Sequence, residues 1–215
     1  MPFSHLPPVI GEALGARGYD ALTPVQQAVT EPEAAGRDLI VSAQTGSGKT
    51  VAFGLALAPE LLDAVGGTPL SERPLVLVIA PTRELALQVS RELGWLYAGA
   101  GLRIATCVGG MDASKERRAL RGGPAIVVGT PGRLRDHLER GALDLSGLIG
   151  VVLDEEAVVG PQCVVGPALA TEHLGRLEEG VVTPLAVRRR RGDAPEDEPR
   201  VLIASEDRVE VAEAE

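Results

Sequence analysis

The chain has 215 residues, which is enough for one large domain or two small ones. Apolar residues make up 45% of it and charged residues 24%, a balance typical of a soluble globular protein. Two cysteines are too few for a disulfide framework or for a zinc site built only from cysteine. No apolar run approaches the ~20 residues of a membrane span, and no basic segment precedes an apolar one at the N-terminus. We therefore expect a cytoplasmic protein without a membrane partner.

The net charge of −9 is spread unevenly along the chain. Residues 1–150 carry nearly equal numbers of basic and acidic side chains, and the acidic excess lies almost entirely in residues 151–215. An acidic chain normally argues against a nucleic acid partner, but that argument does not extend to the first 150 residues. The chain has 19 arginines and only two lysines, Lys49 and Lys115, so a lysine inside a glycine-rich loop is a candidate functional residue.

Five short apolar segments predict strands that are buried on both faces of a sheet. They are unbroken rather than alternating in polarity, which is typical of a parallel sheet. Between them, residues 82–97 place apolar side chains along one face of a helix. Strands that alternate with helices predict an α/β protein with a doubly wound, mostly parallel sheet. The predicted strands are residues 38–42, 75–79, 103–108, 125–128 and 148–153.

The pattern changes after the fifth predicted strand. Gly-Pro pairs interrupt a valine-rich stretch, and four arginines at 188–191 precede a charged run that contains proline. Such a run is typical of solvated, mobile chain, although residues 201–204 predict one further strand. The sequence thus predicts a domain at 1–156, a divergent segment at 157–187 and a flexible charged tail at 188–215.

A glycine-rich loop follows the first predicted strand and opens a helix. Glycines let backbone N–H groups converge on phosphate oxygens, and the helix N-terminus adds its partial positive charge. Lys49 would reach the β- and γ-phosphates of a nucleotide as a catalytic residue, and the Thr50 hydroxyl would bind Mg²⁺. The alternative is a glycine-rich turn that binds nothing. The predicted nucleotide-binding residues here are Ala43, Gln44, Thr45, Gly46, Ser47, Gly48, Lys49 and Thr50.

Two carboxylates, Asp154 and Glu155, end the fifth predicted strand. Asp154 can hold Mg²⁺, and Glu155 can orient an attacking water as the catalytic base. The alternative is a pair of solvated surface carboxylates, which are common on any protein. The phosphate-binding loop upstream favours the functional interpretation.

Taken together, residues 3–156 resemble the first RecA-like domain of a DEAD-box ATP-dependent RNA helicase. The run Thr23-Pro24-Val25-Gln26, preceded by Gly18-Tyr19, is similar to the motif with which that family reads adenine. The resemblance implies that ATP and Mg²⁺ are cofactors, that Gln26 hydrogen-bonds the adenine edge and that Phe3 stacks on the adenine ring. An alternative role for Phe3 is that of a terminal core anchor.

Three further segments resemble the motifs that line the RNA backbone track in this family. Helix N-termini, small residues and arginine are phosphate donors without base preference, so the chemistry agrees. Each segment also has a plainer interpretation: Thr-Pro-Gly is an ordinary turn with a cap, and Arg83 could pair with Glu84 or Glu92. The implied RNA-binding residues are Pro81, Thr82, Arg83, Gly109, Gly110, Thr130, Pro131, Gly132 and Arg133.

The resemblance ends with the box Asp154-Glu155-Glu156-Ala157, in which the family's final Asp is replaced, and no Ser-Ala-Thr motif follows. A second RecA-like domain, which the resemblance implies for unwinding, is also missing from the sequence. We expect a truncated helicase module that binds ATP-Mg²⁺ and single-stranded or structured RNA and needs a second helicase domain, supplied in trans, for hydrolysis and unwinding. One alternative is a non-catalytic nucleotide- or RNA-binding protein derived from a helicase domain. Another is a shifted reading frame after about residue 156.

Overall fold

The computed structural model describes residues 3–41, 43, 46–66 and 73–154, and the backbone of 185–189, 200–205 and 208–213. Its helices are α1 (Pro8–Ala16), α2 (Pro24–Ala28), α3 (Lys49–Gly66), α4 (Arg83–Leu96), α5 (Ala113–Arg121) and α6 (Pro131–Glu139), with 3-10 turns at Pro32–Ala34 and Ala98–Ala100. Its strands are β1 (Leu39–Val41), β2 (Val76–Ile79), β3 (Ile104–Cys107), β4 (Ile126–Gly129), β5 (Gly150–Leu153), β6 (Leu185–Arg189), β7 (Arg200–Ser205) and β8 (Arg208–Glu213).

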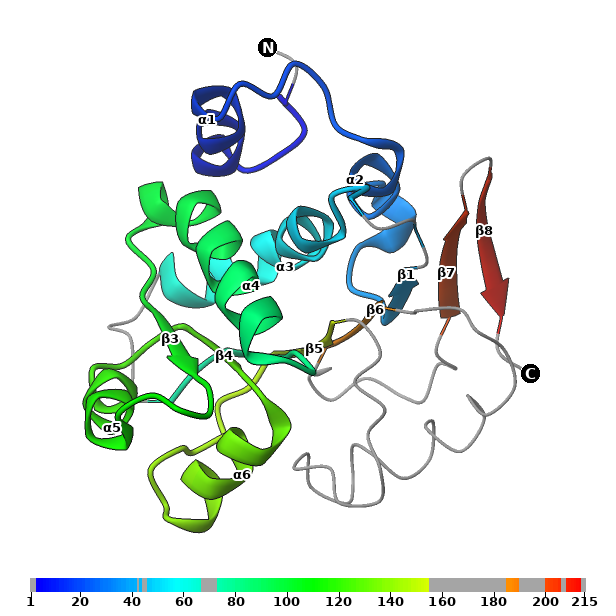
Figure 1. Ribbon diagram of the computed structural model, residues 1–215. Coiled ribbons are helices and arrows are strands. Elements are labelled where there is room, and N and C mark those ends of the chain that lie inside the picture. The colour runs from blue at the N-terminus through cyan, green and yellow to red at the C-terminus, as the bar shows by residue number, and fades with distance from the viewer. Residues whose placement is uncertain are drawn as a thin grey trace.

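Six strands form the main sheet, in the order β1-β6-β5-β2-β4-β3 (Figure 1). Strands β2, β3, β4 and β5 pair in parallel, and β6 runs antiparallel to both β1 and β5. It follows that β1 to β5 all point in one direction. The five predicted strands and the mostly parallel sheet are thereby confirmed: four predicted segments contain a strand, and the remaining one, 125–128, overlaps β4 in all but its last residue, Gly129.

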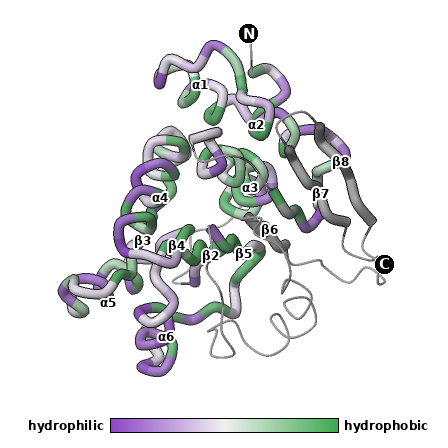
Figure 2. The backbone as a smooth tube through the Cα atoms, turned by 45° about the vertical axis from the view of Figure 1, so that its right-hand side comes forward, coloured by the Kyte–Doolittle hydropathy of each residue, from purple (hydrophilic) through white to green (hydrophobic). Residues whose placement is uncertain are grey.

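Helices cover both faces of this sheet, which is the doubly wound arrangement that the sequence predicts. On β2, Val76 and Val78 join the core beneath α3 and α4, and Leu77 and Ile79 join the opposite core with Leu134 of α6. Figure 2 shows β2, β4 and β5 as a hydrophobic centre between helices with polar outer faces. Burial on both faces explains why these strands are continuously apolar in the sequence.

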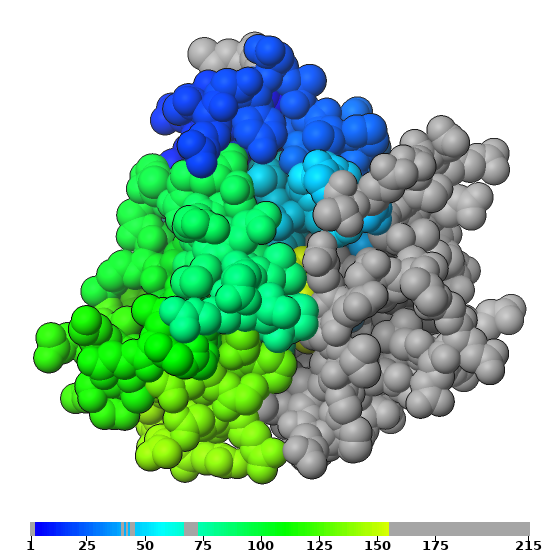
Figure 3. All heavy atoms as spheres, in the orientation of Figure 1, coloured from blue at the N-terminus to red at the C-terminus, as the bar shows by residue number. Residues whose placement is uncertain are grey.

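The N-terminal residues form a cap beside α3 and α4. Phe3, Ile10 and Leu14 are buried in the same core cluster as Phe53 of α3 and Leu96 of α4. Figure 3 shows this N-terminal segment seated on one end of the domain. The cap brings α2 close to the start of α3, where the glycine-rich loop ends.

Part of the tail has regular backbone. The sequence predicts flexible chain from residue 188, but β6 inserts between β1 and β5, and its residues Arg188 and Arg189 pair with Val151 and Gly150. Strands β7 and β8 pair antiparallel in a second, two-stranded sheet, and β7 contains the strand predicted at 201–204. The divergent segment up to residue 184 lies outside the described residues. Within the part of the chain that is described, no helix has the length and apolarity needed to cross a membrane.

Candidate functional site

The loops that carry the predicted site residues lie along one edge of the main sheet. Strands β1 to β5 share one direction, so the segments that follow them all emerge at their carboxyl ends. In open α/β sheets this edge is where ligands bind. The predicted site residues that follow these strands therefore lie along one edge of the sheet.

The glycine-rich loop has two glycines in the left-handed region of backbone conformation. Gly46 and Gly48 adopt positive φ angles of 86° and 88°, which residues with a side chain rarely adopt. Helix α3 begins at Lys49, whose ammonium group donates to the carbonyl of Ala43 at 2.5 Å across the loop. The lysine is thus folded into the loop, with its charge over the backbone that would surround a phosphate. Gln44 and Thr45 lie outside the described residues.

Helix α2 braces the end of this loop. The Thr23 hydroxyl donates to the carbonyl of Ser47 at 2.9 Å, and Gln26 Nε2 donates to the carbonyl of Gly48 at 3.3 Å. Gln26 Oε1 accepts from the backbone N–H of Thr23 at 3.1 Å. Gln26 is 1% exposed, and its amide makes one hydrogen bond at each end, so reading an adenine edge would use its second N–H and its second lone pair and would require the buried side chain to become accessible. That role stays a prediction.

Phe3 lies in the hydrophobic core. It is 6% exposed and packs in the cluster that contains Leu6, Ile10 and Leu14. This position corresponds to the alternative role of a core anchor. Stacking on an adenine ring, which would need an accessible ring face, stays a prediction.

Asp154 lies directly after β5 at the same sheet edge. Its backbone N–H donates to the carbonyl of Ile79 at 2.9 Å, so the carboxyl ends of β5 and β2 are held together there. Asp154 is 2% exposed. Glu155, the predicted base, lies outside the described residues.

Two of the three RNA-related motifs touch each other. Arg83, at the start of α4, donates through Nη1 to the carbonyl of Gly109 at 3.2 Å. Gly110 has a φ of 78°, which favours glycine, and a Cβ at this residue would lie 2.6 Å from Arg83 Nη1, so a side chain there would displace the guanidinium from its present position. Thr82 caps α4 by accepting from the backbone N–H of Leu85. The contact that the structure gives Arg83 is therefore with Gly109, not with Glu84 or Glu92.

The third motif joins the same group of loops. The backbone N–H of Thr130 donates to the carbonyl of Cys107 at 3.0 Å, which places the end of β4 beside the end of β3. Helix α6 begins at Pro131, with proline in its favoured first position. A Cβ built at Gly132 meets no atom within 4 Å, so the first turn of α6 is open on the side of this residue.

Arg133 is held by the protein itself. Its Nε donates to Glu116 Oε2 at 2.6 Å, its Nη1 contacts Asp136 Oδ2 at 3.3 Å, and its Nη2 donates to the carbonyl of Met111 at 3.3 Å. The side chain is 17% exposed. The sequence predicts a phosphate contact here, but these three contacts engage the guanidinium internally.

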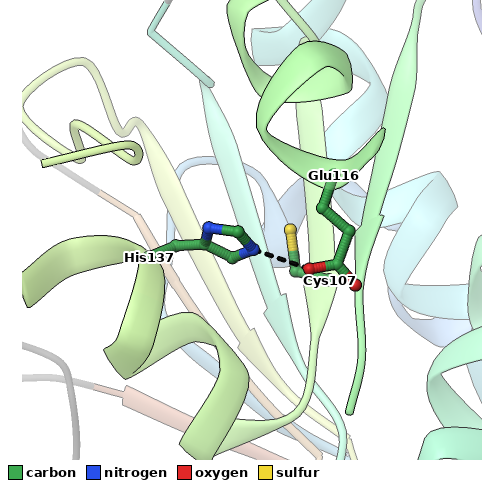
Figure 4. A group of neighbouring side chains, drawn as sticks. All are labelled: Cys107, Glu116 and His137. Atoms are coloured by element: carbon green, nitrogen blue, oxygen red, sulfur yellow. Dashed lines mark hydrogen bonds and ion pairs between the residues drawn. The ribbon is translucent and has the colours of Figure 1, made fainter. Parts of the chain in front are cut away.

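A buried cluster beside Arg133 has no counterpart in the sequence prediction (Figure 4). Glu116 accepts from the backbone N–H of Val108 at 3.0 Å and bonds His137 Nε2 at 2.7 Å, and Cys107 lies next to them. The spacing of Glu116 and Leu120, four residues apart on one face of α5, is the signal that could have marked Glu116 as buried.

The donor atoms of this cluster lie within 4.8 Å of one another, a spacing that raises the question of a metal site. Both carboxylate oxygens of Glu116 already accept hydrogen bonds, one of them from the positively charged Arg133. Burial, aided by the Glu116 carboxylate and opposed by Arg133, raises the pKa of the Cys107 thiol to about 12. Because both oxygens of Glu116 are already engaged by protein donors, and because cysteine binds a metal only as the thiolate, we assign no metal to this cluster.

The fold and the phosphate-binding loop define a RecA-like helicase domain. Residues 23–182 match the family model described as DEAD/DEAH box helicase, and the chain belongs to that family.

Among its relatives, the chain is 48% identical over 145 residues to the ATP-dependent RNA helicase DeaD of Escherichia coli K12, an alignment that covers 67% of this chain and 22% of that protein. It is 45% identical over 148 residues to DEAD-box ATP-dependent RNA helicase 53 of Oryza sativa subsp. japonica, which covers 69% of this chain and 24% of that protein. The crystal structure of the RNA helicase Prp28 from Chaetomium thermophilum bound to ADP superposes with a TM-score of 0.64 at 38% identity, covering 72% of this chain and 38% of that one. The chain thus spans less than a quarter of the length of these two curated relatives.

Proposed function

We propose that this chain is an ATP-binding helicase module that binds ATP with Mg²⁺ and the backbone of RNA. The observation that carries the proposal is the loop that ends at Lys49, with two glycines at positive φ and the lysine ammonium held over its backbone. The relatives named above are described as ATP-dependent RNA helicases, which supports the same function.

The residues present suit a nucleotide and its metal. Lys49 supplies the positive charge for the β- and γ-phosphates, and the loop glycines expose backbone N–H groups to them. The Thr50 hydroxyl and the Asp154 carboxylate are hard oxygen ligands of the kind that Mg²⁺ prefers. When bound, Mg²⁺ neutralises phosphate charge, and Glu155 is the proposed base for the attacking water.

RNA binding would use the adjacent loops at the sheet edge. Arg83, Gly109, Gly110 and the first turn of α6 lie together there, and all of them offer donors suited to phosphate oxygens. Recognition through the backbone implies little preference for base sequence.

Hydrolysis and unwinding would require a second RecA-like domain. We infer this from the general need for arginine fingers, which contribute ~10³–10⁵ in rate to NTPases. A non-catalytic nucleotide- or RNA-binding role is the second candidate, and the replacement of the family's last Asp by Ala157 favours it.

Titration with fluorescent ATP and GTP analogues, with Mg²⁺ or with EDTA, tests the nucleotide site. Because Gln26 offers a donor and an acceptor to adenine, we expect tighter binding of ATP, and weaker binding in EDTA. Lys49→Ala should weaken ATP binding about tenfold or more, because it removes a charge-assisted contact to phosphate. The matched control is Lys115→Ala, which removes the only other lysine, an exposed residue of α5. Equal affinity for the two nucleotides, or equal effects of the two lysine variants, would contradict the proposal.

A further inference from the structure

We propose that Glu116 is a positioning residue that fixes the loop 108–112 against the start of α6. It thereby maintains the relative position of these two segments, which are the proposed RNA-binding segments on this part of the sheet edge. This inference rests on the proposed function, because it assumes that these two segments bind RNA. Glu116 lies on α5, which carries none of the predicted site residues.

The carboxylate of Glu116 joins three elements that are far apart in sequence. Oε1 accepts from the backbone N–H of Val108, the residue before the two loop glycines. Oε2 accepts from Arg133 Nε at 2.6 Å and bonds His137 Nε2 at 2.7 Å, both on α6 (Figure 4). One side chain of α5 thus ties the end of β3 to α6.

Arg133 closes the connection from the other side. Its Nη2 donates to the carbonyl of Met111, so the loop 108–112 is bonded at its start through Glu116 and near its end through Arg133. Gly109 and Gly110 lie between these two fixed points. The guanidinium therefore acts as a strut between α6 and this loop.

A carboxylate is the group that this position needs. Glu116 is 3% exposed and His137 is fully buried, so water cannot replace a lost partner. Three donors converge on two oxygens, and an ionised carboxylate accepts all of them, whereas the amide of a glutamine would oppose one donor with its own N–H groups. His137 Nδ1 has no hydrogen-bond partner in the described part of the chain, so the bond from Nε2 to Glu116 is the one that orients this ring.

Arg133 then contributes to RNA binding through its contacts with Glu116 and Met111, and not through a direct contact with phosphate. If Arg133 bound phosphate directly, Arg133→Ala would reduce the slope of log affinity against log salt by about 0.7 for single-stranded RNA. If Arg133 acts through Glu116 and Met111, the variant lowers RNA affinity with an unchanged slope. We expect the second result.

The experiment compares Glu116→Gln with Glu139→Gln, which removes an exposed carboxylate that pairs with Arg135 on α6. Three quantities are measured for each: affinity for labelled oligouridine RNA with a non-hydrolysable ATP analogue present, affinity for that analogue alone, and amide hydrogen exchange. We expect Glu116→Gln to weaken RNA binding about tenfold, equivalent to ~1.4 kcal/mol. Exchange should quicken in residues 108–112 and 130–133 but not in the loop 46–50, and analogue affinity should be unchanged. Glu139→Gln should leave all three as in the wild type.

A second variant covers the case in which Glu116→Gln does not fold. Glu116→Gln combined with Arg133→Met removes both charges of the ion pair together, which proteins tolerate better than the loss of one partner. The double variant should show the same faster amide hydrogen exchange in residues 108–112.

Unchanged exchange in residues 108–112 of whichever variant folds, or an equal loss of RNA affinity and analogue affinity, overturns the positioning role. Failure of the wild type to bind RNA overturns the proposed RNA function instead, and the exchange data distinguish the two results.

Discussion

At the scale of single residues, Gly48 is the point at which the glycine-rich loop contacts Gln26 of α2. It has a φ of 88°, and a Cβ built there would lie 2.3 Å from Gln26 Nε2. A side chain at this position would therefore be strained in the backbone and would displace the amide that braces the loop. The need for glycine here has two independent physical causes.

We expect Gly48→Ala to lower ATP-analogue affinity about tenfold or more, since both the loop and Gln26 must shift. The control is Gly94→Ala in α4, where φ is not positive and a Cβ meets no atom within 4 Å. Fluorescence titration measures both variants. An unchanged affinity in Gly48→Ala would show that the loop conformation described here is not the one that binds nucleotide.

Cys107 gives the molecule a pH dependence in alkaline solution. Burial first, and the Glu116 carboxylate second, raise the pKa of its thiol to about 12 from a model-peptide value of 9.0, while Arg133 lowers it. The unfolded chain therefore loses this proton at lower pH than the folded one does, and the stabilisation is present below pH 9 and is lost as the pH rises toward 12. In a Cys163→Ser background, thiol reagents at pH 8 should label Cys107 only after denaturation. Rapid labelling of the native protein would contradict this.

The residues that the sequence does not reveal are those whose partners come from another element. Glycines at positive φ and a lysine in a glycine-rich loop act locally, so Gly46, Gly48 and Lys49 could be predicted from the sequence alone. Arg133 could not, because its partner Glu116 lies on a different helix and only the fold brings them to 2.6 Å. A motif predicts which residues gather in a region, but not whether a charge there faces a ligand or the protein.

At the scale of elements, strands β1 to β5 could be predicted from the sequence because helices cover both faces of the sheet. In a continuous apolar run such as Val76–Ile79, the side chains on both faces of the strand are apolar and buried. Such runs therefore predict buried parallel strands. The antiparallel β6 was not predicted, because Arg188 and Arg189 give its sequence the character of solvated chain. Its place comes from backbone pairing with β1 and β5, which sequence patterns do not specify.

The contact between α3 and α4 depends on one small residue. Gly54 of α3 is buried, and a Cβ there would lie 2.6 Å from Leu96 Cδ2 and 3.0 Å from Leu93 Cδ2. Tyr97 also donates its hydroxyl hydrogen to the Gly54 carbonyl at 2.6 Å, so the backbone of α3 is close to the end of α4.

Gly54→Ala and Gly94→Ala should therefore change stability in opposite directions, although both replace a helical glycine with the best helix former. Overpacking against two buried leucines should cost about 1–3 kcal/mol at Gly54. The exposed Gly94 in α4 should gain about 0.5–1 kcal/mol from the lower entropy of the unfolded chain. Urea denaturation of the two variants measures both values. A stabilising Gly54→Ala would mean that the two helices are less closely packed than described.

At the scale of the whole molecule, the acidic net charge opposes the RNA binding that we propose. The net charge is −9, so long-range electrostatics oppose binding of a polyanion, and binding must depend on local donors at the sheet edge. We expect weak affinity that falls steeply with salt and is similar for unrelated RNA sequences of equal length. Filter binding of several labelled oligonucleotides across a salt series measures this. A strong sequence preference would indicate base recognition and would contradict the proposed backbone track.

Catalysis is the property that depends most on the molecule as a whole. Lys49, Thr50 and Asp154 are suited to hold a nucleotide and its metal, yet the charge that develops on the γ-phosphate during transfer needs further stabilisation. A candidate internal substitute for the arginines of a second domain is the run 188–191. Two of its members, Arg188 and Arg189, belong to β6 and pair with Val151 and Gly150, at the opposite end of β5 from Asp154. The run is tested by substitution, since deletion would also remove a strand of the main sheet.

We expect ATP turnover by this 215-residue chain to stay near background, with or without single-stranded RNA. Replacing Arg188, Arg189, Arg190 and Arg191 together with glutamine should leave that low rate and the ATP affinity unchanged, because arginines in a charged run are solvated or paired with neighbouring carboxylates. Steady-state phosphate release measures the rate, with full-length Escherichia coli DeaD as the positive control. RNA-stimulated turnover in the range of ~1–10³ s⁻¹ typical of enzymes, lost in the fourfold variant, would show that these arginines complete the site and that the chain is an enzyme by itself.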